Sequence, residues 1–131
     1  MKGRTTDGLG VTEGQAYDEF QRGMQLLEAG NSHAAVPPLE RARDLEPGKG
    51  SVREALARAY FNSQQFDAAR DEFAEALAIS PANDYAHFGL GLSLMRLGDP
   101  ATARGHLRLA LAMNPESEHY RRAVASLGER R

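Results

Sequence analysis

Four histidines are the side chains best suited to hold a metal ion or to move a proton: His33, His87, His106 and His119. None of them stands four residues from another histidine or from a carboxylate, which is the spacing that a helical metal site uses. The chain has no cysteine, so disulfides, thiolate nucleophiles and cysteine zinc sites are excluded. We therefore predict that the chain holds no metal.

The sequence also lacks clear motifs for binding phosphate or for catalysis by paired carboxylates. The stretch PGKGS at residues 47–51 lacks the G-x-x-x-x-G-K-[ST] spacing of a phosphate-binding loop, and no predicted strand precedes it. The acidic neighbours Asp71, Glu72 and Glu75 are interpreted as the solvated face of a helix. No nucleophile stands in a recognisable pair with a base. We predict a chain that is not an enzyme and that uses no cofactor.

Composition describes a globular chain without a strong electrostatic bias. Of its 131 residues, 41% are hydrophobic and 26% are charged, and the formal net charge is −2. Bulk charge therefore gives no attraction to nucleic acid or to anionic lipid. No apolar run is long enough to span a membrane, and the first residues lack the apolar core of a secretory signal. We predict a cytoplasmic protein with no nucleic-acid partner and no membrane span, although a chain trimmed of its leader would look the same.

A short tail and seven helices follow from the pattern of breakers and helix-forming residues. Residues 1–11 are rich in Gly, Thr and charge and are predicted to be a flexible tail. No later segment alternates with the period of a strand, so we expect no sheet. The predicted helices are 13–29, 32–46, 52–62, 65–79, 84–96, 100–113 and 116–127.

Helix starts are marked by residues whose side chains accept hydrogen bonds from free backbone amides. The predicted N-cap residues are Thr12, Asn31, Ser51, Asn83 and Asp99. Gln15 and Glu54 follow two of these caps by three residues, as in a capping box. Pro37 and Pro38 fall inside the second predicted helix, where a proline removes an amide donor. We expect an irregular first turn there, the alternative being that residues 32–36 are not helical.

A constant sequence period organises the chain. Pro47, Pro81 and Pro115 each end a helix and are evenly spaced, which defines repeats at 16–49, 50–83 and 84–117. Small residues that permit close helix crossings and large apolar residues that fill the space beside them recur in phase. The sets that recur are Gly23, Ala57 and Gly91; Ala35, Ala69 and Ala103; Ala42, Ala76 and Ala110; Leu39, Phe73 and Leu107; and Leu26, Tyr60 and Leu94.

This pattern resembles the tetratricopeptide repeat, a helix-turn-helix unit of about 34 residues. The resemblance implies an all-α, right-handed α-solenoid over residues 12–127, with three repeats, a capping helix at 116–127 and a C-terminal tail at 128–131. Glu19 and Arg22 are polar where the family has large apolar residues, as suits an exposed first helix. Beyond Pro115, an apolar stripe with polar flanks suits a solubilising cap, with the stripe made of Tyr120, Ala123, Val124 and Leu127.

The first helix of each repeat carries a second apolar face in repeats one and three. On a helix with 100° per residue, this face lies nearly opposite the packing face, where an ordinary surface helix is polar. The resemblance implies that it lines a concave groove for a peptide. The predicted groove residues are Tyr17, Phe20, Met24, Leu27, Glu54, Arg58, Phe61, Asn62, Tyr85, Phe88, Leu92, Met95 and Arg96. The alternative for Phe20, Phe61 and Phe88 is a place in the core.

The partner expected from the resemblance is a protein or peptide, bound by an adaptor, scaffold or co-chaperone-like module. Neighbouring helices about 8–10 Å apart would give a groove on the order of 25 Å, enough for about seven extended residues. The alternative is a homodimer that buries the same apolar face. Some family members hold a C-terminal carboxylate at five positions, but here those positions carry Phe20, Met24, Ala55, Tyr85 and Gly89, none of which pairs with a carboxylate.

Overall fold

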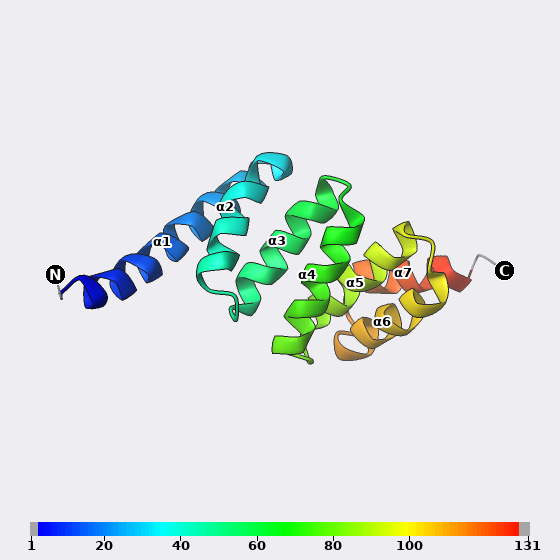
Figure 1. The fold of residues 1–131 in the computed structure, drawn as a ribbon. Helices are drawn as coiled ribbons and strands as arrows, with labels where there is room; N and C mark the ends of the chain where they lie inside the picture. Colours follow the sequence, from blue (N-terminus) through cyan, green and yellow to red (C-terminus); the bar gives the residue numbers. More distant parts are fainter. Residues whose placement is uncertain (1–2, 129–131) are drawn as a thin grey trace.

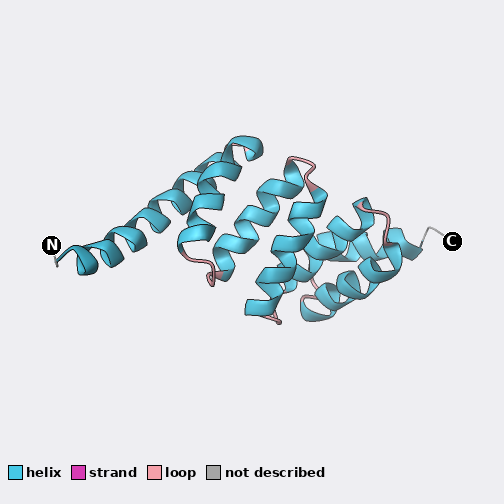
Figure 2. Cartoon of the chain, viewed as in Figure 1, coloured by secondary structure: helices cyan, strands magenta, loops and turns pink. Residues whose placement is uncertain are grey.

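The computed structural model describes residues 3–128, and the side chains of residues 14–127. This part of the chain forms seven helices and contains no strand (Figures 1 and 2). The helices are α1 (Gly3–Glu28), α2 (Ser32–Leu45), α3 (Gly50–Asn62), α4 (Phe66–Ile79), α5 (Asp84–Arg96), α6 (Pro100–Met113) and α7 (Glu118–Gly128). The predicted all-α class is confirmed, and the predicted bounds of α2 to α7 agree with the structure to within two residues.

The helices stack as hairpins along one direction, from α1 at one end to α7 at the other (Figure 1). Three hairpins pair α1 with α2, α3 with α4, and α5 with α6. Each second helix also packs on the next first helix, as α2 does on α3, α4 on α5 and α6 on α7. The first helices of successive hairpins touch as well, α1 with α3 and α3 with α5. The chain is therefore a solenoid of helix hairpins.

Small residues sit where the paired helices cross, as the period predicts. A Cβ at Gly23 would overlap the Leu39 side chain, and one at Gly91 would lie 2.7 Å from Leu107 Cδ2. Ala57, the equivalent residue of repeat two, is fully buried. The two alanine sets of the period are also fully buried: Ala35, Ala69 and Ala103, and Ala42, Ala76 and Ala110. Close helix approach in every repeat thus depends on side chains no larger than a methyl group.

The turn inside each hairpin has the same backbone geometry. In repeat one, Gly30 N–H donates to Leu27 O and Asn31 N–H donates to Leu26 O, which is the Schellman arrangement of a helix end. Gly98 has the same place in repeat three, and Gln64 has it in repeat two. All three are left-handed, with φ of +82° at Gly30, +66° at Gln64 and +86° at Gly98. Gln64 therefore adopts a conformation that glycine adopts at lower cost.

The N-terminal prediction differs from the structure. Helix α1 begins at Gly3 and runs through Thr12, so residues 3–11 are helical where a tail was expected, and Thr12 is not a cap. Its first turns project beyond α2 (Figure 1). Once a helix has formed, each added residue gains a backbone hydrogen bond, so it can extend past its packing partner. The predicted tails also include residues 1–2 and 129–131, which lie outside the described residues.

Of the four remaining predicted caps, Asn83 and Asp99 are confirmed with their hydrogen bonds, Asn31 occupies the predicted N-cap position, and Ser51 is wrong. The side chains of Asn83 and Asp99 accept from the amides of Ala86 and Thr102. Asn31 makes no side-chain cap bond, and Lys49 rather than Ser51 occupies the N-cap of α3, since that helix begins at residue 50. An N-cap side chain is chosen by the exact backbone conformation, which a sequence pattern fixes only to within a residue or two.

Packing decides between the alternatives for the start of α2, where the predicted helix is confirmed, and it corrects one further expectation. Residues 32–36 are helical despite Pro37 and Pro38, because the same helix buries Ala35, Val36 and Leu39 in the core, and this burial offsets the lost amide bonds. Glu72 is not on a solvated face, because its side chain is only 9% exposed and lies between two arginines.

Candidate functional site

The inner face of the solenoid is formed by α1, α3, α5 and α7, and it is hollowed along its length. At the α1 end, a cavity of 380 Å³ is lined by Ala16, Tyr17, Phe20, Glu46, Lys49, Ser51 and Val52. Next to it, a cavity of 170 Å³ is lined by Phe20, Met24, Ser51, Glu54, Ala55 and Arg58. These two lie between α1 and α3.

Two further cavities continue the same face toward the C-terminal end. Between α3 and α5, a hollow of only 40 Å³ is lined by Arg58, Phe61, Asn62, Phe73, Tyr85, Phe88, Gly89 and Leu92. Between α5 and α7, a cavity of 530 Å³ is lined by Phe88, Leu92, His119, Arg122, Ala123, Ala125 and Ser126. Neighbouring cavities share residues, namely Phe20, then Arg58, then Phe88. The four cavities therefore follow one another along this face, and together they are called the inner groove.

At the α1 end of this groove, the most exposed aromatic residue of the described chain is Tyr17. Its side chain is 62% exposed, although tyrosine side chains are large, partly apolar and usually partly buried. Gln21 donates to the Tyr17 hydroxyl at 3.1 Å, which holds the ring along the helix. Lys49 pairs with Glu46 at 3.2 Å, so the charge at this end is locally balanced.

The centre of the groove carries the charged residues of α3. Glu54 accepts a hydrogen bond from Asn83 Nδ2 at 3.0 Å, which ties α3 to the start of α5. Arg58 follows one turn later and borders two cavities. Burial raises the pKa of the nearby Tyr85 hydroxyl, which keeps that group neutral at physiological pH.

Aromatic residues form a connected row beneath the groove toward α7. Phe73 meets Tyr85 edge to face with ring centroids 6.0 Å apart, Tyr85 meets Phe88 at 6.4 Å, and Phe88 meets Tyr120 at 4.7 Å. Tyr120 also donates from its hydroxyl to Asp84 at 2.9 Å, which fastens α7 to α5. Contacts of this geometry favour a rigid wall, because each ring restricts its neighbour.

Ten of the thirteen predicted groove residues line these cavities. The other three do not. Leu27 is a core residue with 4% exposure. Met95 packs against the core, and Arg96 lies over the rings of Phe61 and Phe66 at 5.5 and 4.8 Å. Of the rings with a core alternative, Phe20 and Phe61 also pack on the core while bordering the groove.

Helix α7 adds residues that were not predicted for the groove. Arg122 and Ser126 belong to the polar flanks of the predicted cap, and they line the last cavity with Phe88 and Leu92. A signal for this was available, because His119, Arg122 and Ser126 follow Tyr85, Phe88 and Leu92 by one full repeat length. The period simply continues past residue 117, so the cap also serves as a fourth inner helix.

The side chains needed for other kinds of site are not gathered here. Among the described residues, no group of three or more His, Asp or Glu side chains is placed to hold a metal ion. None of the helices within residues 3–128 combines the length and the hydropathy needed to cross a membrane.

Stacked helix hairpins with an open, grooved inner face define the class of helical-repeat solenoids. The family model described as "Tetratricopeptide repeat" matches residues 20–84 and again residues 54–118, one repeat further on. The chain therefore belongs to the tetratricopeptide repeat family, as its sequence period predicts.

Curated relatives have similar repeats within much longer chains. Tetratricopeptide repeat protein 28 of Homo sapiens is 26% identical over 114 residues, which are 87% of this chain and 5% of that protein. Superkiller complex protein 3 of Mus musculus is 28% identical over 110 residues, which are 84% of this chain and 7% of that protein. The chain thus spans only a small part of the length of these relatives.

Several solved structures have the same fold. MamA superposes with a TM-score of 0.83 at 18% identity, covering 95% of this chain and 72% of that one. The first repeat domain of Spaghetti (RPAP3) gives 0.82 at 17% identity, covering 88% and 91%. YrrB gives 0.77 at 20% identity, covering 82% and 56%. At these identities the likeness establishes the fold, and the function has to be argued from the groove.

Proposed function

We propose that this chain is a non-catalytic protein–protein interaction module that binds a peptide or a helix of a partner in its inner groove. The observation that carries the proposal is the continuous line of cavities from Tyr17 on α1 to Ser126 on α7. Such a groove offers aromatic and methionine side chains, which adapt to an apolar partner surface. The role would be that of an adaptor, a scaffold or a co-chaperone-like subunit.

Two structural neighbours support this proposal. The Spaghetti domain was solved with an HSP90 peptide, SRMEEVD, and YrrB is described as having an unusual peptide-binding site. The present groove would not take a peptide by a clamp on its terminal carboxylate. The positions that would supply that clamp carry apolar or small side chains and the hydroxyl of Tyr85.

Peptide binding can be tested without knowing the natural partner. A random library of seven-residue peptides is displayed and selected on the purified chain, and the dissociation constant of an enriched peptide is measured by fluorescence anisotropy. Tyr17→Ala and Leu92→Ala, which change the groove, are expected to weaken binding about tenfold each, because each removes an apolar contact worth roughly 1.4 kcal/mol. Leu109→Ala is the matched control, since Leu109 is 45% exposed on α6, which is not an inner helix.

Equal losses for Leu109→Ala and Tyr17→Ala would contradict a groove site, and the absence of any enriched peptide would count against a peptide ligand. Self-association through the same face remains the alternative prediction. Sedimentation velocity over a hundredfold range of concentration separates the two: a dimer that Tyr17→Ala dissociates would favour the alternative, and a monomer at all concentrations would remove it.

A further inference from the structure

Arg58 has an unusual environment among the arginines of the described chain. Five others each reach a carboxylate within hydrogen-bond distance: Arg41, Arg43, Arg53, Arg70 and Arg121. Those in residues 14–127 without such a partner are exposed to water: Arg22, Arg96, Arg104, Arg108 and Arg122. Arg58 alone in this range is partly buried and has no hydrogen bond or ion pair with any described residue. A guanidinium that has lost part of its water and gained no acceptor is poised to bind an anion.

The nearest acidic residue on the same helix is engaged elsewhere. Glu54 stands four residues before Arg58, a spacing at which opposite charges on a helix usually pair. Its carboxylate instead accepts from Asn83 Nδ2 at 3.0 Å, while the Asn83 side-chain oxygen caps α5 by accepting from Ala86 N–H. Asn83 thus ties Glu54 to α5 and leaves Arg58 without its expected partner.

We propose that the groove recognises an extended peptide segment carrying an acidic side chain for Arg58 and a large apolar side chain beside it. This inference rests on the proposed function and specifies its ligand. Arg58 lines the 170 Å³ cavity whose apolar walls are Phe20, Met24 and Ala55. Its remaining lining is Ser51 and Glu54, and the Glu54 carboxylate is already bonded to Asn83. A cavity of about 150 Å³ holds a benzene molecule, so this one has room for a leucine, methionine or phenylalanine side chain.

The groove selects a side-chain carboxylate and not the end of a chain. Arg58 lies between two cavities, and the groove continues past it to the 530 Å³ cavity against α7. A segment that fills the groove therefore passes Arg58 and does not stop there. The 40 Å³ hollow on the α5 side is about the volume of one water molecule, so no large side chain enters it. The large apolar residue must then lie on the α1 side of the acid, two positions away on the same face of an extended strand.

The test compares peptides selected on three versions of the chain. Libraries of seven-residue peptides, displayed with both ends embedded in a carrier, are selected on the wild type, on Arg58→Gln and on Arg58→Glu. The wild type is expected to enrich Asp or Glu two positions from Leu, Met or Phe, and Arg58→Glu to enrich Lys or Arg at the acidic position. Arg104→Glu makes the same change of charge on an exposed residue of α6 and should select the same peptides as the wild type.

Affinities then give the size of the effect. For a peptide enriched on the wild type, Arg58→Gln and the replacement of the peptide's Asp by Asn should each weaken binding about tenfold to a hundredfold, because a charge-assisted hydrogen bond is lost. The two changes together should cost little more than either one. Capping the peptide's C-terminus as an amide should leave the affinity unchanged.

The possible results distinguish failure of the role of Arg58 from failure of peptide binding in the groove. Peptides that bind in competition with one another but show no acidic preference, or keep it on Arg58→Glu, would overturn the role of Arg58 and leave the groove as a binding site. Loss of binding on amidation would likewise replace the side-chain carboxylate with a chain terminus. A selection that enriches nothing on any version would overturn both the inference and the proposed function.

Discussion

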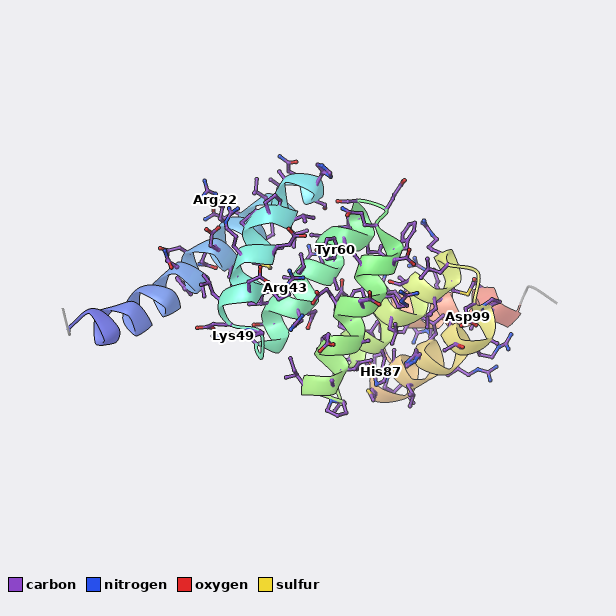
Figure 3. All side chains as sticks on the ribbon, in the orientation of Figure 1. Arg22, Arg43, Lys49, Tyr60, His87 and Asp99 are labelled. Atoms are coloured by element: carbon purple, nitrogen blue, oxygen red, sulfur yellow. The ribbon has the colours of Figure 1, made fainter. Side chains whose placement is uncertain are left out.

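Two junctions between successive repeats have the same place in the fold and are built from different chemistry. At the first junction, where α2 meets α3 and α4, the buried carboxylate of Glu72 accepts from Arg43 at 2.8 Å and from Arg53 at 3.0 Å. Three helices from two repeats are thereby joined by one acid. The Tyr60 hydroxyl donates to Glu40 nearby, and burial together with this bond raises the pKa of Tyr60 to about 12. In Figure 3, Arg43 is labelled where α2 faces α3, and Tyr60 is labelled on α3.

At the second junction, where α4 meets α5, an aromatic ring packs directly on a glycine. The ring of Phe73 occupies the space that a Cβ of Gly89 would need. One repeat earlier, the equivalent positions of the first junction hold Leu39 and Ala55, both buried. A larger residue on one helix is thus matched by a smaller one on the other. The comparison shows that the two facing side chains at this helix crossing must together fill a fixed volume. Phe with Gly and Leu with Ala both fill it.

The largest effect should come from removing the charge at the first junction. Glu72→Gln keeps the shape of the side chain but leaves the partly buried Arg53 without a counter-ion and Arg43 with only the exposed Asp44. We expect the free energy of unfolding to fall by about 3 kcal/mol, since breaking a buried ion pair is costly. Urea denaturation measures this, with Glu75→Gln, an exposed residue of the same helix, as a control expected to change stability by less than about 0.5 kcal/mol. A loss no larger than that of the control would show that the ion cluster is dispensable.

The second junction should be most sensitive to added volume. Gly89→Ala places a methyl group against the Phe73 ring, and overpacking of this kind should cost about 2 kcal/mol. Combining it with Phe73→Leu recreates the residue pair of the first junction, so the double variant should be more stable than the sum of the two single changes predicts. A double-mutant cycle measured by urea denaturation gives this coupling. Strict additivity would refute the idea that the two junctions are alternative solutions for one volume.

The turns within the repeats allow a second comparison, in which the expected change in the free energy of unfolding is smaller. Gln64→Gly gives repeat two the residue that repeats one and three have in the same left-handed position, and should raise the free energy of unfolding by about 1 kcal/mol. Gly98→Gln makes the opposite change in the same motif and should lower it by a similar amount. Thermal or urea denaturation of both variants tests this, and changes of the same sign would contradict it.

The smallest predicted effect is a pH dependence in repeat three. His87 Nε2 donates to Pro81 O and its Nδ1 lies 3.0 Å from His106 Nδ1, an arrangement that two neutral rings satisfy with one shared proton. Burial and the charge of His87 lower the pKa of His106. As the pH falls through about 6.5, the pKa of a histidine in the unfolded chain, the unfolded chain binds more protons than the folded one. The free energy of unfolding should therefore decline in this range.

The expected size of this decline is a few tenths of a kcal/mol, because His106 is only partly buried and solvent screens part of the interaction. Denaturation at pH 5.5 and 7.5 measures it, and His106→Gln should remove most of the difference. His33→Gln, at an exposed histidine of α2, should leave the difference in place. A wild type that is more stable at pH 5.5 would reverse the sign of the argument.

The sequence by itself determined the repeat, the helix hairpins and which face of the first helices carries most of the cavity-lining residues. This was possible because a constant period places equivalent residues in equivalent surroundings. Gly23 and Gly91 had to be small, since every repeat brings two helices together at that point. Tyr17 and Phe88, which line these cavities, could be predicted for this face because an apolar face that is not needed for packing within a hairpin is visible in the helical periodicity.

Only the tertiary structure decided which of the remaining side chains meet. Glu72 was assigned to a solvated face because a local pattern does not show that Arg43 and Arg53, 29 and 19 residues away, converge on it. Leu27 was assigned to the groove because the helical period does not show how far a face turns toward its neighbour. Arg58 is notable only because Glu54 bonds Asn83 across a repeat boundary. Periodicity fixes which face a residue is on, whereas pairing between faces depends on distances that only the packed chain sets.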